Sequence, residues 1–162
     1  MPLGIDIGTS ACKAAAFEEN GRIAAGTGAE YPLRYPHEGW AEQEPDDWWD
    51  GVCRALRALW KTIRPEQVDA VGIAGQSWAA VAVDNEGSVL APSPIWYDGR
   101  AARLCAQSTV DPFPVSGNPF MAGYSLPKIL WMRENMPDVY EKADVFLQSN
   151  GFIAYRLTGV RS

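Results

Sequence analysis

The sequence opens with two apolar stretches joined by a short polar turn, GIDIGTSACKAAAF over residues 4–17. These apolar stretches predict a short buried strand over residues 3–7 and a second strand over residues 11–17. A turn this short joins only antiparallel neighbours, because a parallel pair needs a long crossover. The fold is therefore constrained to begin with an antiparallel strand pair.

An Asn-Gly turn follows the second strand, in EENG over residues 18–21. This dipeptide is a strong hairpin signal and predicts that residues 22–31 return as a third antiparallel strand. Further along, apolar runs bounded by turn or capping residues predict more elements. They are a helix from Pro45, a strand over 68–76, a hairpin turning at 84–87, a helix over 101–107, a helix from Ser125 that stops at Pro137, a strand over 145–147, and a final helix capped by Ser149 and ended by Gly159.

The helix from Pro45 has the clearest pattern. Asp46 and Asp47 follow the proline in the first turn, where the helix dipole favours acidic side chains. Apolar residues then recur at i, i+3, i+4 and i+7, which predicts one face packed on the core. That face is expected to comprise Trp49, Val52, Cys53, Leu56, Leu59, Trp60 and Ile63.

Three antiparallel strands followed by alternating helices and strands predict an α/β domain with a mixed β-sheet flanked by helices. At 162 residues the chain can bury one full core, so one domain is the expectation. Its 47% apolar and 21% charged residues are typical of a folded globular protein.

The net charge is −6 at pH 7. This disfavours nucleic acid and anionic membrane as partners, although backbone N–H groups and a metal ion can still neutralise a phosphate locally. The three cysteines lack metal-ligand spacing, which indicates reduced thiols and a cytoplasmic protein. We expect neither a signal segment nor a membrane-spanning segment, because no apolar run is long enough.

Five residues that suit phosphate chemistry lie around the first turn: Asp6, Gly8, Thr9, Ser10 and Lys13. A carboxylate at a strand end can hold hydrated Mg²⁺, which needs only one or two carboxylates. The glycine allows close approach to a phosphate, the next N–H and hydroxyl groups can donate to it, and the lysine can add positive charge. The residues alone leave open a plain turn with a local Asx hydrogen bond.

Other stretches occur with this turn in a fixed order. They are GWAEQEPDDWW over 39–49, GIAGQ over 72–76, WYDGR over 96–100, GYSLPKILWMREN over 123–135 and YRLTG over 155–159. Together with GIDIGTS, this series resembles the N-terminal domain of the FGGY family of carbohydrate kinases and is most similar to its xylulose kinases. Several ordered motifs over the whole chain are a far more specific signal than any one of them.

The resemblance implies a ribonuclease-H-like, actin-like ATPase fold, in which two such domains close around ATP and a sugar. It assigns Asp6 to the region of Mg²⁺ and the phosphates. Gly8, Thr9 and Ser10 fall in the phosphate hairpin, and Lys13 falls where the family often has a basic residue. ATP, Mg²⁺ and a sugar are thus the implied ligands.

On the sugar side, the resemblance implies roles for Gln76, Ser77 and Trp78, and for Asp98 and Arg100 at the border of the same cleft. Residues 76–79, Gln-Ser-Trp-Ala, depart from the Gln-Met-His-Gly of xylulose kinases, so an indole stands where an imidazole would be. Residues 148–152 depart from the family's Pro-Lys-Asp-Tyr. These departures leave open which sugar is used, with D-xylulose or a related ketose or polyol expected.

Three plainer interpretations accompany these roles. Lys128 is expected on a helix surface, and Asp98 with Arg100 can be read as an ordinary surface ion pair. Trp96 and Trp131 are expected in the core or the cleft wall, as large aromatic side chains mostly bury.

The resemblance places the catalytic-base aspartate beyond residue 162 and implies a second domain that is absent here. We therefore expect a truncated N-terminal domain over residues 1–162 that is inactive alone, since phosphoryl transfer needs both closed domains. Whether the full-length enzyme forms a homodimer is left open by the sequence. The rival interpretations are a non-catalytic sugar or nucleotide sensor and an actin-like filament subunit, and fold alone does not separate them.

Overall fold

A computed structural model describes residues 1–109 and 111–161. The chain forms two compact units where the sequence indicated one core. Unit 1 comprises the described residues of 1–32, 45–76 and 149–162, and unit 2 comprises those of 33–44 and 77–148.

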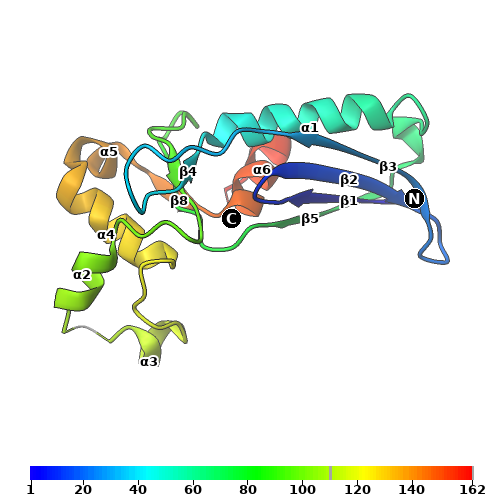
Figure 1. The fold of residues 1–162 in the computed structure, drawn as a ribbon. Helices are drawn as coiled ribbons and strands as arrows, with labels where there is room; N and C mark the ends of the chain where they lie inside the picture. Colours follow the sequence, from blue (N-terminus) through cyan, green and yellow to red (C-terminus); the bar gives the residue numbers. More distant parts are fainter. Residues whose placement is uncertain (110, 162) are drawn as a thin grey trace. The chain divides into compact units, whose positions relative to one another are not determined.

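Unit 1 is built on a four-stranded sheet with the strand order β3-β2-β1-β5 (Figure 1). The strands are β1 (Pro2–Ile7), β2 (Ala11–Phe17), β3 (Ile23–Glu30) and β5 (Ala70–Gly75). The first three pair antiparallel in sequence order, and β5 lies parallel to β1. The predicted mixed sheet is confirmed.

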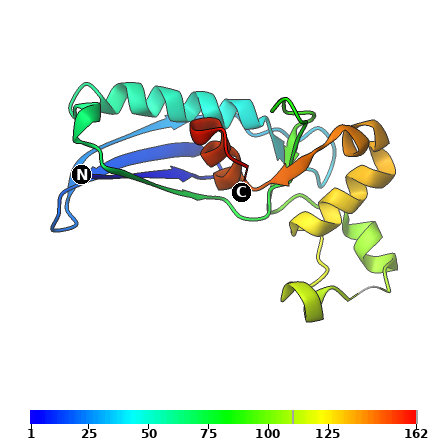
Figure 2. The same cartoon turned by 180° about the vertical axis from the view of Figure 1, so that it is seen from behind.

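Two helices cover one face of this sheet, α1 (Pro45–Leu59) over β2 and β3 and α6 (Ser149–Thr158) beside β5 (Figure 2). The strand residues that face them form the core of unit 1; these are Leu3, Ile5, Ile7, Cys12, Ala14 and Ala16. Because side chains alternate along a strand, Asp6 and Lys13 belong to the opposite face. A 3₁₀ turn at Pro65–Gln67 (η1) precedes β5.

Helix α1 begins at Pro45 as predicted, but its buried face differs from the expected one. The buried residues are Pro45, Trp48, Gly51, Val52, Ala55 and Leu59. Trp49 and Leu56, which the pattern placed in the core, are only half-buried. The helix lies so close to its neighbours that a Cβ on Gly51 would be 2.9 Å from the Tyr31 ring. A residue without a side chain is therefore required at position 51, where the helix meets Tyr31.

Unit 2 contains two short antiparallel strand pairs. One joins β6 (Val81–Val83) to β8 (Val145–Leu147), and the other joins β4 (Glu42–Gln43) to β7 (Ser93–Pro94). Its helices are α2 (Ala102–Gln107), α3 (Phe113–Ser116), α4 (Ser125–Asn135) and α5 (Pro137–Lys142). Pro137 ends α4 as predicted and also starts α5, since proline suits the first turn of a helix.

The outcome differs among the remaining predicted elements. The turn at 84–87 forms, with Gly87 N–H donating to the Asp84 carbonyl, but the return strand is reduced to one bridge, between Val83 and Val89, and β6 pairs along its length with β8. Strand β5 was predicted to be buried, yet Val71 is 50% exposed. Gly159 ends α6 in the left-handed conformation, as predicted. No helix in the described ranges has both the length and the apolarity to cross a membrane.

Candidate functional site

The predicted phosphate hairpin is the turn between β1 and β2 in unit 1. Gly8 N–H donates to the Ala11 carbonyl (3.1 Å), and a Cβ on Gly8 would lie 3.1 Å from that same oxygen. The Tyr31 hydroxyl donates to the Gly8 carbonyl, and Tyr31 N–H donates to the Ser10 carbonyl. These bonds hold the turn from both sides and leave the Ser10 side chain exposed.

Asp6 and Lys13 are directly opposite each other across the β1–β2 pair, and both are exposed. Opposed residues of an antiparallel pair point to the same face. That face is the one turned away from α1 and α6, and there it forms an open hollow of about 470 Å³ that Phe17 also lines. A carboxylate and an ammonium group therefore lie side by side on this face, next to the turn between β1 and β2.

A metal at this hairpin would have few protein ligands. Across the residues described, no three His, Cys, Asp or Glu side chains cluster as a metal site. The exposed Asp6 carboxylate fits a magnesium ion, which keeps most of its waters and takes one or two carboxylates, better than a metal that needs a protein cage. The residues present thus fit a hydrated Mg²⁺ carried with a phosphate ligand.

Of the residues predicted for the sugar side, Gln76 belongs to unit 1, where its N–H donates to the Ile7 carbonyl (2.8 Å). The Ser149 hydroxyl donates to the Gln76 carbonyl (2.8 Å), so this serine begins α6 bonded to the end of the β5 strand segment. Ser77 and Trp78 follow in unit 2, and both are exposed. Trp78 has φ +61°, a left-handed conformation that residues other than glycine rarely adopt.

The Trp78 indole stacks on the Tyr124 ring, with centroids 4.3 Å apart and planes inclined by 32°. Both rings line a cavity of about 160 Å³ together with Ser125 and Gln148. Gln148 Nε2 donates to the Ser125 hydroxyl (2.7 Å), whereas the buried Gln148 Oε1 has no hydrogen-bond partner within the described part of the chain. An acceptor left in this way suits a ligand that brings a hydroxyl group.

Asp98 and Arg100 form a buried network in unit 2. The Asp98 carboxylate accepts from Arg100 Nε (2.8 Å) and from Ala41 N–H (2.6 Å), and Arg100 Nη2 donates to Glu42 (2.6 Å). The guanidinium also lies over the Trp40 ring, 4.0 Å from its centroid. Asp98 is 1% exposed, so the surface ion-pair interpretation is wrong. Both groups are engaged in fixing the loop before β4.

Lys128 also differs from expectation, because it is fully buried rather than on the surface of α4. Its amine donates to the carbonyls of Trp78 (2.7 Å) and Gly123 (2.6 Å). Burial lowers the pKa of Lys128 to about 7; the Asp98 carboxylate opposes this decrease and the Arg100 guanidinium adds to it. The prediction failed because the apolar pattern of α4 does not distinguish a buried lysine from an exposed one.

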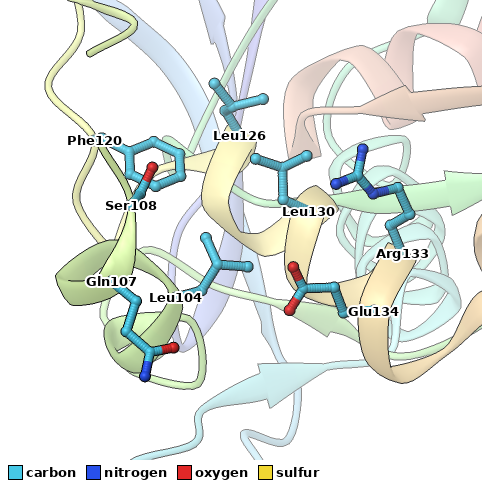
Figure 3. A pocket seen from close by; sticks show the side chains of 8 residues that line it. All are labelled: Leu104, Gln107, Ser108, Phe120, Leu126, Leu130, Arg133 and Glu134. Carbon is cyan, nitrogen blue, oxygen red and sulfur yellow. The ribbon is translucent and has the colours of Figure 1, made fainter. Parts of the chain in front are cut away.

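A separate cavity of about 310 Å³ lies between α2 and α4 (Figure 3). Its lining is mixed: Leu104, Leu126 and Leu130 are apolar, whereas Arg133 and Glu134 of α4 are charged. None of the predicted site residues lines it, so it has no part in the candidate site.

Comparison with known proteins identifies the class. The model of the FGGY family of carbohydrate kinases, N-terminal domain, matches residues 1–162. The xylulose kinase of Escherichia coli (strain K12) is 35% identical over 98% of this chain and 34% of its own, and that of Bacillus subtilis (strain 168) is 33% identical over 98% and 33%. The crystal structure of a xyloylose kinase from Brucella ovis matches 97% of this chain and 34% of its own with a TM-score of 0.91 and 31% identity.

The chain belongs to the FGGY family of carbohydrate kinases, which confirms the resemblance and the fold expected from it. It spans about a third of the length of the curated relatives it matches.

Two residues that line the cavity beside Trp78, Tyr124 and Gln148, were not predicted, and neither was the contact of Lys128 with the Trp78 carbonyl. Tyr124 and Lys128 fall inside the motif over 123–135, and Gln148 begins the stretch over 148–152 that departs from the family pattern. Membership of a motif was the available signal, and it did not say which side chains are buried.

Proposed function

We propose that the chain is the N-terminal domain of an ATP-dependent carbohydrate kinase, which transfers the γ-phosphate of ATP to a hydroxyl of D-xylulose or a related ketose or polyol. The observation that carries this proposal is the match of the family model over residues 1–162. The Escherichia coli and Bacillus subtilis relatives, both xylulose kinases, favour a ketose.

In this proposal Asp6 holds Mg²⁺, which neutralises phosphate charge when it is bound. The N–H and hydroxyl groups of Thr9 and Ser10 donate to phosphate oxygens, and Gly8 keeps the turn free of a side chain. Lys13 adds a positive charge on the same face as Asp6. The hairpin is exposed, and hydrogen bonds already fix its backbone. This supports these roles, since phosphate binding by backbone groups requires a preorganised backbone.

Ser77 and Trp78 contact the sugar, with Gln76 at the end of the strand segment before them. The Trp78 indole offers an apolar face, and the Gln148 Oε1 accepts a hydroxyl proton in the adjoining cavity. Asp98 and Arg100 act through the loop that they fix, because their polar atoms already bond within unit 2.

We also propose that the chain alone is inactive and that the parent is cytoplasmic. The aspartate that deprotonates the sugar hydroxyl lies beyond residue 162 in this proposal, as does the second domain, so the chain lacks the groups that close on the substrate. The three cysteines, all of them free, are compatible with a reducing compartment.

The test is phosphorylation by the complete protein, supplied with Mg²⁺-ATP and a panel of ketoses and polyols. We expect turnover of one sugar, strongly reduced in Asp6→Ala and retained in Asp50→Ala, which removes an exposed carboxylate of α1. Binding of sugar or nucleotide without turnover of any sugar would favour the non-catalytic sensor. Turnover by the 162-residue chain alone would contradict the proposed inactivity.

A further inference from the structure

Trp78 has a backbone conformation that needs external support. It is the one non-glycine residue with positive φ in the described ranges. A left-handed conformation brings the Cβ of an L-residue close to its own carbonyl, so an unsupported tryptophan would relax to negative φ. Such a change would rotate the indole away from its present direction. Something in unit 2 must therefore hold the peptide of Trp78.

The Lys128 amine holds it directly. Nζ donates to the Trp78 carbonyl (2.7 Å) and to the Gly123 carbonyl (2.6 Å). The second carbonyl belongs to the peptide bond just before Tyr124, the residue on which the Trp78 indole stacks. One amine thus connects the backbones beside both rings of the stack.

Neighbouring bonds secure the same segment. The Ser125 hydroxyl donates to the carbonyl of Ala79 (3.0 Å), so the first turn of α4 binds two successive carbonyls, those of Trp78 and Ala79. A Cβ on Gly123 would lie 2.6 Å from the Trp96 carbonyl, so only glycine fits where the backbone of residue 123 passes residue 96. The 77–79 segment is therefore bound to α4 at more than one point.

A buried lysine is an unfavourable choice for packing alone. Its chain could be replaced by methionine without placing an amine in the core, and a buried amine is tolerated only where acceptors surround it. Here the two carbonyls are acceptors, Asp98 is a nearby negative charge, and Arg100, paired with Asp98 and Glu42, is a nearby positive one. The function of this lysine is therefore to make the two hydrogen bonds, and packing alone does not account for it.

We propose that Lys128 is a positioning residue, whose amine holds Trp78 in its left-handed conformation and so keeps the indole stacked on Tyr124 at the cavity wall. The sugar-contacting role of Trp78 rests on the proposed function. The positioning itself does not, and it can be tested without any sugar or nucleotide.

The test uses two-dimensional ¹H–¹⁵N spectra of the 162-residue chain, which has seven tryptophan indole N–H groups. Loss of one cross-peak in Trp78→Phe assigns the indole of Trp78. In Lys128→Met we expect this cross-peak to move or broaden as the ring current of Tyr124 is lost, while the indole of Trp48 in unit 1 stays in place. Lys142→Met, which removes an exposed lysine of α5, is the matched control and should leave every indole unchanged.

A folded Lys128→Met chain with an unchanged Trp78 cross-peak would overturn the proposal. If that variant does not fold, the unmodified chain decides. Its Trp78 cross-peak should titrate with a midpoint near 7, because the bonds from an ammonium to the carbonyl are stronger than those from a neutral amine. His37 packs on Trp40, the ring that Arg100 also covers, and is therefore the other group to exclude as the source of the change. The titration of the Trp78 cross-peak should persist in His37→Gln. A Trp78 cross-peak that is flat from about pH 6 to about pH 8.5, a range spanning the ordinary histidine and cysteine values, would refute the role.

Discussion

The hydroxyl of Tyr31 donates a hydrogen bond to the carbonyl of Gly8, which ties the residue after β3 to the turn between β1 and β2. Tyr31 is buried. Burial, assisted by the nearby Cys12 and Asp6, raises the pKa of Tyr31 well above its usual range. The phenol therefore stays protonated and remains a donor at any pH at which the protein is used.

Tyr31→Phe should remove this bond and lower the free energy of unfolding by about 1 kcal/mol, the usual contribution of one hydrogen bond whose acceptor can turn to water. Urea unfolding measures the change. Tyr140→Phe is the control, because the Tyr140 ring packs on Phe146 and no hydrogen bond of its hydroxyl is present in the described part of unit 2. Equal effects of the two changes would contradict the role given to the Tyr31 hydroxyl.

Gly123→Ala should destabilise the chain by about 1–3 kcal/mol, the usual cost of forcing an extra carbon into a packed site. Its Cβ would lie 2.6 Å from the Trp96 carbonyl, and backbone on both sides must shift. Gly72→Ala, on β5, is the matched change, since no atom lies within 4 Å of its added Cβ. Thermal unfolding of both variants tests this, and a Gly123→Ala protein as stable as Gly72→Ala would show that the crossing is not tight.

Asp98→Ala should lower the free energy of unfolding by about 3–5 kcal/mol, because it leaves the buried Arg100 guanidinium with one carboxylate partner fewer. The exposed pair between Arg156 and Asp46 offers a comparison at a similar distance, 2.7 Å. Asp46→Ala should cost less than about 1 kcal/mol, as water already solvates this pair. Chemical denaturation of the two variants gives the comparison, and similar losses would argue against a structural role for the buried network.

Stability should rise with pH from about 7 upward because of Lys128. Its pKa is lowered in the folded protein from 10.5 to about 7, so the unfolded chain binds a proton that the folded chain has lost. Stability then increases with pH, by at most about 1.4 kcal/mol per pH unit for one proton. Denaturant unfolding at several pH values measures the slope.

The upper limit of this window comes from the cysteines. Burial raises the pKa of Cys12 to about 11, with the Asp6 carboxylate adding to the increase. Above about pH 8.5, where an ordinary thiol ionises, the unfolded chain loses that proton first, so Cys12 contributes a negative slope that offsets the positive slope of Lys128. The slope due to Lys128 should therefore be read between about pH 7 and about pH 8.5. It should disappear in Lys128→Met, and a slope that survives this change belongs to another group.

The elements that depend on local sequence were predicted well. Strands β1 and β2, the start of α1 at Pro45 and the left-handed Gly159 each follow from a few adjacent residues, through short apolar stretches, an N-terminal proline and a C-terminal glycine. The exposure of β5 was not predictable, because an apolar run reads as buried whether or not other elements cover it. The partner of β6 was also missed, since hairpin signals favour the nearest strand over β8.

The candidate site divides in the same way. Asp6, Gly8 and Lys13 are close in sequence, so the sequence predicted that they lie around one turn. The structure adds that Asp6 lies opposite Lys13 across the strand pair. The surroundings of Trp78 were not accessible from its neighbours in sequence. Its carbonyl partner, Lys128, is 50 residues away, and Asp98 is 57 residues from the Ala41 N–H that it accepts from.

By itself, the sequence determined the antiparallel start of the sheet, the helix from Pro45 and, through its ordered motifs, the FGGY family to which the chain belongs. The tertiary structure alone decided that Lys128 is buried, that Trp78 is left-handed and that Arg100 is enclosed by Asp98 and Glu42. The physical reason is that local preferences act through neighbouring residues, whereas the burial of a charge depends on which distant groups arrive to accept its hydrogen bonds.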